Sequence, residues 1–93
     1  TIEELLSKKD SYKGKIVKIS GKVMKYNEGI MGKNWIHLQD GSSFDGEYDL
    51  TVTTDVQVKV GDVINIEGII TLNKDFGAGY FYKIIMESAK IID

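Results

Sequence analysis

Two long stretches of the chain alternate apolar and polar residues, and each has a glycine in the middle of its apolar side. Residues 15–28 and 62–72 have the period of two that predicts a β-strand, with Gly21 and Gly68 on the apolar side. A glycine at such a place indicates a sharp bend, a bulge or a close crossing. A strand bent in this way can pair on both sides of a small closed barrel, which removes exposed edges. The other expected inward residues are Val17, Ile19, Val23, Ile64, Ile66 and Ile70.

Three further strands are expected, over residues 34–39, 48–54 and 80–91. Glycine-containing turn segments separate all five, and the connection over residues 55–61 is too short to hold a helix between strands. In the two shortest strands the alternation points Ile36, Leu38, Leu50 and Val52 inward, and Trp35, His37, Gln39, Asp49, Thr51 and Thr53 outward.

The start of the chain predicts a short helix over residues 1–9. Thr1 and Glu4 have the spacing of a capping box, and Lys8 and Lys9 fall in the expected last turn. A helix this short is not stable by itself, so we expect it to pack on the barrel, either over one end or along its side. Its expected buried stripe is Ile2, Leu5 and Leu6.

The 93 residues are enough for one domain, and 42% of them are hydrophobic. The fold class that we expect is all-β with one short N-terminal helix: a five-stranded OB-fold Greek-key barrel. The single domain covers residues 1–93, with the helix at 1–9 and the barrel at 15–91. A flat β-sandwich is the alternative, but that fold usually has about seven strands.

Composition excludes several classes of function. Without cysteine there is no disulfide, thiolate metal site or cysteine nucleophile, and the single histidine, His37, rules out a histidine cage or catalytic pair. No apolar run reaches the roughly 20 residues of a membrane-spanning helix. Because the chain begins at Thr1, we expect a mature or excised piece, from which any export signal has been removed. We predict a non-enzymatic binding module without a cofactor.

The charges are unevenly distributed along the chain. All twelve basic residues are lysine; residues 1–33 hold eight of them against four acids, whereas residues 34–62 hold one against six acids. This is not the uniformly basic surface of a duplex-binding protein, and without arginine there is no bidentate group for phosphate or guanine. We therefore expect a modest basic stripe beside a weakly acidic patch.

Three segments resemble OB-fold domains related to anticodon-binding modules. They are Val-Lys-Ile-Ser-Gly-Lys-Val at 17–23, Trp-Ile-His-Leu-Gln-Asp at 35–40 and Val-Gly-Asp-Val-Ile-Asn-Ile-Glu-Gly at 60–68. The resemblance extends over about residues 15–91. Gln39 stands where that family has arginine, and the helix between strands three and four is missing, so both differences count against binding of tRNA.

The segments at 27–41 and 75–82 are similar to small bacterial OB domains of exported proteins and lipoproteins. Those domains are usually labelled nucleic-acid- or nucleotide-binding on the analogy of the fold. The resemblance implies a periplasmic or cell-envelope location rather than a cytoplasmic one.

The outward side of strands one to three is the expected binding face, where OB folds hold single strands by stacking and by backbone charge. Aromatic rings would stack on bases, lysines would meet phosphates, and polar side chains would bind base or sugar edges. The candidate residues are Lys22, Lys25, Tyr26, Trp35, His37, Gln39 and Thr51, with Phe76 and Tyr80 from the loop at 73–82.

Several of these residues have a second interpretation. Trp35 can instead pack beneath a loop, where its indole N–H finds a partner. The loop at 73–82 either clamps a flat ligand or forms a hydrophobic latch across the barrel mouth. Residues 40–49 are acidic enough to suggest Ca²⁺, although a solvated turn is the simpler interpretation. His37 is expected at the surface, with Asp49 and Thr51 as its nearest partners.

Two functions from different classes remain. The first is a module that binds single-stranded nucleic acid or a nucleotide across strands one to three. The alternative is an interaction domain of the bacterial cell envelope that binds a protein or a glycan.

Overall fold

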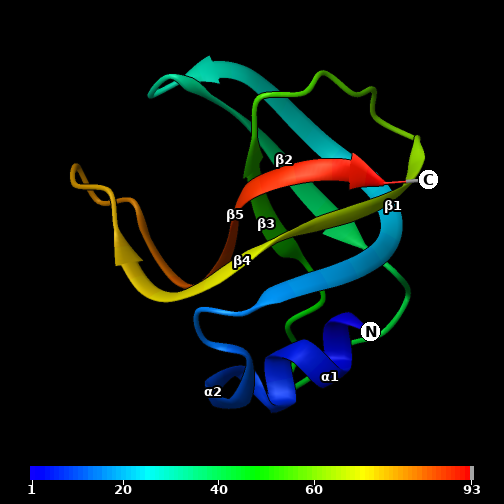
Figure 1. Ribbon diagram of the computed structural model, residues 1–93, viewed down its shortest axis with the longest axis vertical. Helices are drawn as coiled ribbons and strands as arrows, with labels where there is room; N and C mark the ends of the chain where they lie inside the picture. The colour runs from blue at the N-terminus through cyan, green and yellow to red at the C-terminus, as the bar shows by residue number, and fades with distance from the viewer. Residues whose placement is uncertain (93) are drawn as a thin grey trace.

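The structure is a computed structural model that describes residues 1–92, and two short helices precede five strands in it (Figure 1). The elements are α1 (Ile2–Ser7), α2 (Lys9–Tyr12), β1 (Ile16–Ile30), β2 (Lys33–Gln39), β3 (Leu50–Thr54), β4 (Val63–Asp75) and β5 (Phe81–Ile92). No helix among residues 1–92 is long and apolar enough to cross a bilayer.

The five strands form one sheet that closes into a ring in the order β1-β2-β3-β5-β4, with β4 hydrogen-bonded back to β1. All neighbours are antiparallel except β3 and β5, which are parallel. The expected set of five strands is confirmed. The largest difference in strand ends is in β4, which continues to Asp75 because its hairpin with β5 extends beyond the ring.

The two mid-strand glycines allow close crossings. β1 pairs with β4 over residues 16–22 and with β2 from Lys22 onward, so the strand passes from one neighbour to the other near Gly21. A Cβ on Gly21 would lie 2.8 Å from Leu38 Cγ, and one on Gly68 would lie 2.5 Å from Met86 Cγ. Both distances are shorter than a side chain tolerates, so the prediction of a bend or close crossing is confirmed at both glycines.

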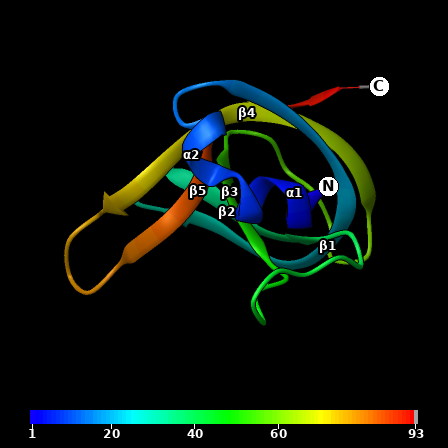
Figure 2. The same cartoon turned by 90° about the horizontal axis from the view of Figure 1, so that it is seen from below.

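Helix α1 covers one end of the ring (Figure 2). The predicted capping box between Thr1 and Glu4 is present, and the predicted stripe of Ile2, Leu5 and Leu6 is buried. The predicted end of this helix is wrong. Its last residue is Ser7, because the backbone of Lys8 leaves the helical region at φ −120°, and Lys9 begins α2.

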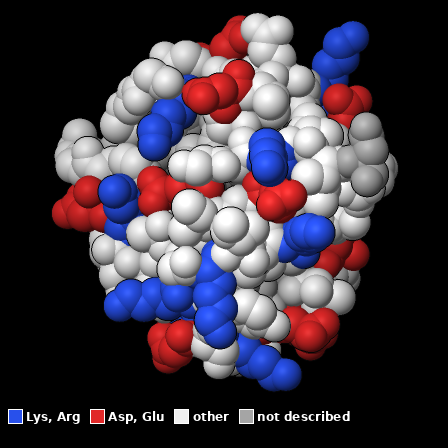
Figure 3. Space-filling view, in the orientation of Figure 1, with Lys and Arg blue, Asp and Glu red and all other residues white. Residues whose placement is uncertain are grey.

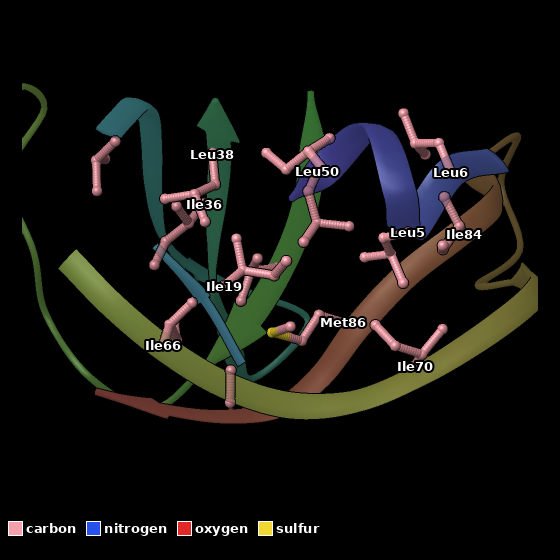
Figure 4. Packing of buried hydrophobic residues seen from close by; sticks show 14 of the residues in the cluster. Leu5, Leu6, Ile19, Ile36, Leu38, Leu50, Ile66, Ile70, Ile84 and Met86 are labelled. Atoms are coloured by element: carbon pink, nitrogen blue, oxygen red, sulfur yellow. The ribbon is translucent and has the colours of Figure 1, made fainter. Parts of the chain in front are cut away.

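The core lies inside the ring and continues into the helix that covers its end (Figure 4). Every strand contributes to it, and its members in β1 to β4 are residues that the alternation predicted to point inward. It includes Leu5, Ile19, Ile36, Leu38, Leu50, Val52, Ile66, Ile70 and Met86.

Two hairpins extend beyond the ring on the same side of the molecule (Figure 1, left). The β1–β2 arm, residues 27–33, turns through Met31 and Gly32, whose φ values of 52° and 74° fit a two-residue type I′ turn. The β4–β5 arm, residues 73–82, turns through a glycine-rich loop with positive φ at residues 77–79. Both arms contact Trp35 of β2, the first through Ile30 and the second through Phe76 and Tyr82.

Candidate binding face

The outer face of β2 follows the predicted alternation. Trp35 and His37 lie on the side of the strand opposite to the core residues Ile36 and Leu38. In the strand register His37 pairs with Lys25 of β1 and Thr51 of β3. The structure therefore brings together His37, Gln39, Thr51, Lys22 and Lys25, which were predicted to share one face.

Trp35 is outward-facing but covered, with only 5% of its surface exposed. Its indole Nε1–H donates to the carbonyl of Ile30 in the β1–β2 arm at 2.8 Å. From the β4–β5 arm, Phe76 meets the indole edge to face at 5.1 Å between ring centroids, and Tyr82 lies at 5.7 Å. Of the two arrangements foreseen for Trp35, the structure has the packed one, and the loop at 73–82 forms the hydrophobic latch.

We call Trp35, Phe76 and Tyr82 the aromatic latch. Its third pair, Phe76 and Tyr82, is T-shaped at 6.0 Å, and Lys74 Nζ lies 5.4 Å from the centroid of Phe76. Burial raises the pKa of Tyr82, and the charge of Tyr80 adds to the shift. Because the rings cover one another, a nucleobase can stack on Trp35 only after the β4–β5 arm moves.

Tyr26 does not lie beside Trp35. The β1–β2 register shifts by one residue between Val23 and Lys25, which changes the side on which later residues of β1 fall. Tyr26 consequently pairs with the inward-facing Ile36 and packs against the core. Desolvation and the carboxylate of Glu28 raise its pKa.

A polar row runs along the outer face beyond Trp35, and we define it as His37, Gln39 and Asp49. Gln39 Nε2 donates a hydrogen bond to Asp49 Oδ1. His37 Nδ1 lies 3.6 Å from Asp49 Oδ2, and this nitrogen is buried without a hydrogen-bond partner. Thr51, beside His37, is only 8% exposed, so its hydroxyl is poorly accessible. The sequence analysis placed Asp49 outward and beside His37 but did not count it among the candidate binding residues.

Lys22 and Lys25 are exposed on the β1 edge of this face. In the strand register Lys22 pairs with Gln39, and Lys25 with His37. Lysine and acidic side chains are interspersed on the side of the molecule in Figure 3, with no broad basic patch there. On β1, Lys22 and Lys25 are the lysines in register with the polar row.

In the acidic loop between β2 and β3, Asp40 accepts hydrogen bonds from the start of helix α1 and from its own loop. Asp40 Oδ2 accepts from the Ile2 N–H at 2.8 Å, and its Oδ1 accepts from the Ser42 N–H at 2.9 Å. Burial acts to raise the pKa of Asp40, but the hydrogen bonds from Ser42 and Ile2 outweigh it and hold the pKa below its usual value. Within residues 1–92, no three histidine, aspartate or glutamate side chains come close enough to hold a metal ion.

The tips of both arms carry exposed apolar side chains. On the β4–β5 arm Tyr80, a predicted site residue, is 49% exposed and Phe81 is 53% exposed. On the β1–β2 arm Ile30 and Met31 are 41% and 47% exposed. The sequence analysis did not count Ile30, Met31 or Phe81 among the candidate residues; the available signal was the place of Ile30 and Phe81 at the ends of hairpin strands and of Met31 in the turn.

Comparisons with protein-family models, curated proteins and solved structures give no match for this chain.

Proposed function

We propose that this chain is an OB-fold Greek-key barrel that acts as a non-enzymatic binding module for single-stranded nucleic acid or a nucleotide. The observation that carries the proposal is the outer face of β1–β3, where Lys22 and Lys25 border the polar row. Lysines beside hydrogen-bonding side chains suit a ligand with a phosphate backbone and polar base edges. The two arms border this face.

The ligand would use the polar row first and the aromatic latch second. Because Trp35 is covered, direct stacking on its indole requires Phe76 to leave. Tyr80 and Phe81 are exposed rings on the β4–β5 arm that can stack without such a movement. Binding to this face should therefore be weak, and a change in Trp35 fluorescence would report displacement of the arm.

The test is the anisotropy of a labelled 12-nucleotide single strand, titrated with protein at several salt concentrations. Two to three phosphate contacts would give a slope of log affinity against log salt of about −1.4 to −2. Replacing Lys22 and Lys25 with alanine removes two of these contacts and should bring the slope to between about 0 and −0.7. The matched control replaces Lys83 and Lys90, two exposed lysines of β5, and should leave the slope unchanged. Absence of binding by any oligonucleotide at low salt contradicts the proposal.

A second candidate is an interaction domain of the cell envelope that binds a protein or glycan. It is favoured by the exposed apolar tips of the arms, because such side chains suit protein interfaces better than phosphate backbones. Capture from an envelope fraction by the parent protein, lost when Met31 and Phe81 are both replaced with serine, would support it. Capture that survives this double change would count against a role for the tips.

A further inference from the structure

The carboxylate of Asp49 determines how two neighbouring side chains are oriented on the outer face. Gln39 Nε2 donates to Asp49 Oδ1, and His37 Nδ1 lies 3.6 Å from Asp49 Oδ2. An ionised carboxylate only accepts hydrogen bonds. The atoms that face Asp49 must therefore be donors.

For Gln39 this requirement fixes the amide. Its NH₂ group faces Asp49, so its carbonyl Oε1 is left to accept a hydrogen bond from elsewhere. The reverse orientation would place two acceptors against each other.

For His37 the same requirement fixes the tautomer. Nδ1 is buried beside Asp49, and a lone pair there would face a carboxylate oxygen across 3.6 Å. A proton on Nδ1 removes this repulsion, and in the neutral ring it leaves the lone pair on Nε2. The His37 side chain is 29% exposed and its buried nitrogen is Nδ1, so the exposed edge carries Nε2.

We infer that His37 Nε2 and Gln39 Oε1 form a pair of acceptors that selects ligand groups with hydrogen-bond donors, and that Asp49 is the residue that positions both. The ligand class rests on the proposed function; the orientation of the two side chains does not. On a single strand the matching groups are the exocyclic amino groups of adenine and cytosine and the 2′-hydroxyl of RNA. Thymine fits less well, since its single imino donor lies between two carbonyl acceptors.

The orientation is tested without a ligand by ¹⁵N NMR of the imidazole at pH 8, where an ordinary histidine is neutral. The spectrum of the parent protein should show a protonated Nδ1. Asp49→Asn can donate as well as accept, so it should shift the ring toward the Nε2–H form. Asp45→Asn is the matched control: it removes the same charge from an exposed residue of the same loop and should leave the tautomer unchanged. A parent protein with protonated Nε2 overturns the inference.

The ligand class is tested with oligo(dA), oligo(dC), oligo(dT) and oligo(rA) of equal length. We expect oligo(dA) and oligo(dC) to bind roughly three- to tenfold more tightly than oligo(dT). Asp49→Asn should abolish this preference and Asp45→Asn should keep it. A gain for oligo(rA) over oligo(dA) identifies the hydroxyl as the donor, whereas equal affinity identifies the amino group.

The two experiments distinguish a failure of the donor selection from a failure of the proposed function. Equal affinity for all four strands, with Nδ1 protonated, overturns the donor selection and leaves the proposed function standing. If no strand binds, the proposed function fails and the ligand class fails with it, while the NMR result still decides the orientation of His37.

Discussion

Phe76 meets the indole of Trp35 edge to face, with 5.1 Å between the ring centroids and 69° between their planes. Because Trp35 also donates to the carbonyl of Ile30, one side chain of β2 contacts both arms. An outward-facing residue of the sheet has thus become the centre of a second, smaller packed cluster. Access to Trp35 is consequently controlled by the β4–β5 arm.

Removing Phe76 should open this cluster. Phe76→Ala deletes an aromatic contact with Trp35 and another with Tyr82, so we expect a loss of about 1–3 kcal/mol in the free energy of unfolding. The indole should then meet water, and its emission should move to longer wavelength. Urea unfolding followed by fluorescence measures both effects.

The control for this change is Phe81→Ala in the same arm. Phe81 is 53% exposed and is not one of the rings stacked on Trp35. Its loss should therefore leave the emission wavelength unchanged and alter the free energy of unfolding by no more than about 0.5 kcal/mol. Equal effects of the two substitutions would show that Phe76 does not hold the arm to β2.

Helix α1 should contribute much of the stability of the ring. Leu5 is 1% exposed and belongs to the main core cluster, so Leu5→Ala should cost about 2–5 kcal/mol. Ser7→Ala, at an exposed position of the same helix, should stay within about 0.5 kcal/mol of the parent. Thermal unfolding of the two variants checks this, and a cost below about 1 kcal/mol for Leu5→Ala would mean that the helix does not seal the ring.

Most of the fold could be predicted because alternation and glycine report directly on local backbone geometry. The inward residues of β1 to β4 follow from the period of two, and Gly21 and Gly68 mark the crossings. The end of α1 could not be predicted, because Lys8 is a good helix former and nothing local in the sequence stops the helix there.

The candidate site could be predicted only in part. Alternation gives the face on which a side chain lies, but not which distant segment covers it, so the burial of Trp35 under Phe76 required the structure. A single shift in the β1–β2 register after Val23 places Tyr26 on the core side, and no residue type in that stretch indicates such a shift. The neighbourhood of His37 and Asp49, by contrast, followed from the expected pairing of adjacent strands.

Asp40 should make the free energy of unfolding decrease as the pH is lowered. Its folded pKa lies below the ordinary value of about 3.9, so the unfolded chain binds a proton more readily than the folded one. The stabilisation is therefore complete at neutral pH and is lost as the pH falls through about 4 toward the folded pKa. Asp40→Ala should cost about 1–2 kcal/mol at pH 7, because Ile2 N–H and Ser42 lose their acceptor.

Measuring the free energy of unfolding of the parent and of Asp40→Ala from pH 7 to pH 3 separates this effect from a general loss of charge. Below about pH 4 the difference between the parent and Asp40→Ala should shrink, since the parent carboxyl is then protonated as well. Asp45→Ala removes an exposed carboxylate from the same loop and should show no such convergence. A gap between the parent and Asp40→Ala that stays constant from pH 7 to pH 3 would contradict the role assigned to this carboxylate.

Gly68 should be less tolerant of a side chain than Gly21. A Cβ at Gly68 would lie 2.5 Å from Met86 Cγ and 2.8 Å from the carbonyl oxygen of Glu87, whereas at Gly21 the nearest atoms are at 2.8 and 2.9 Å. The Met86 side chain can rotate away, but the Glu87 carbonyl belongs to the backbone of β5, so the strands themselves must separate. We expect Gly68→Ala to cost about 1–3 kcal/mol and Gly21→Ala somewhat less, with Lys18→Ala, at an exposed strand position, near zero. Urea unfolding of the three variants gives the order, and a Gly68→Ala protein as stable as the parent would show that the ring does not depend on this close crossing.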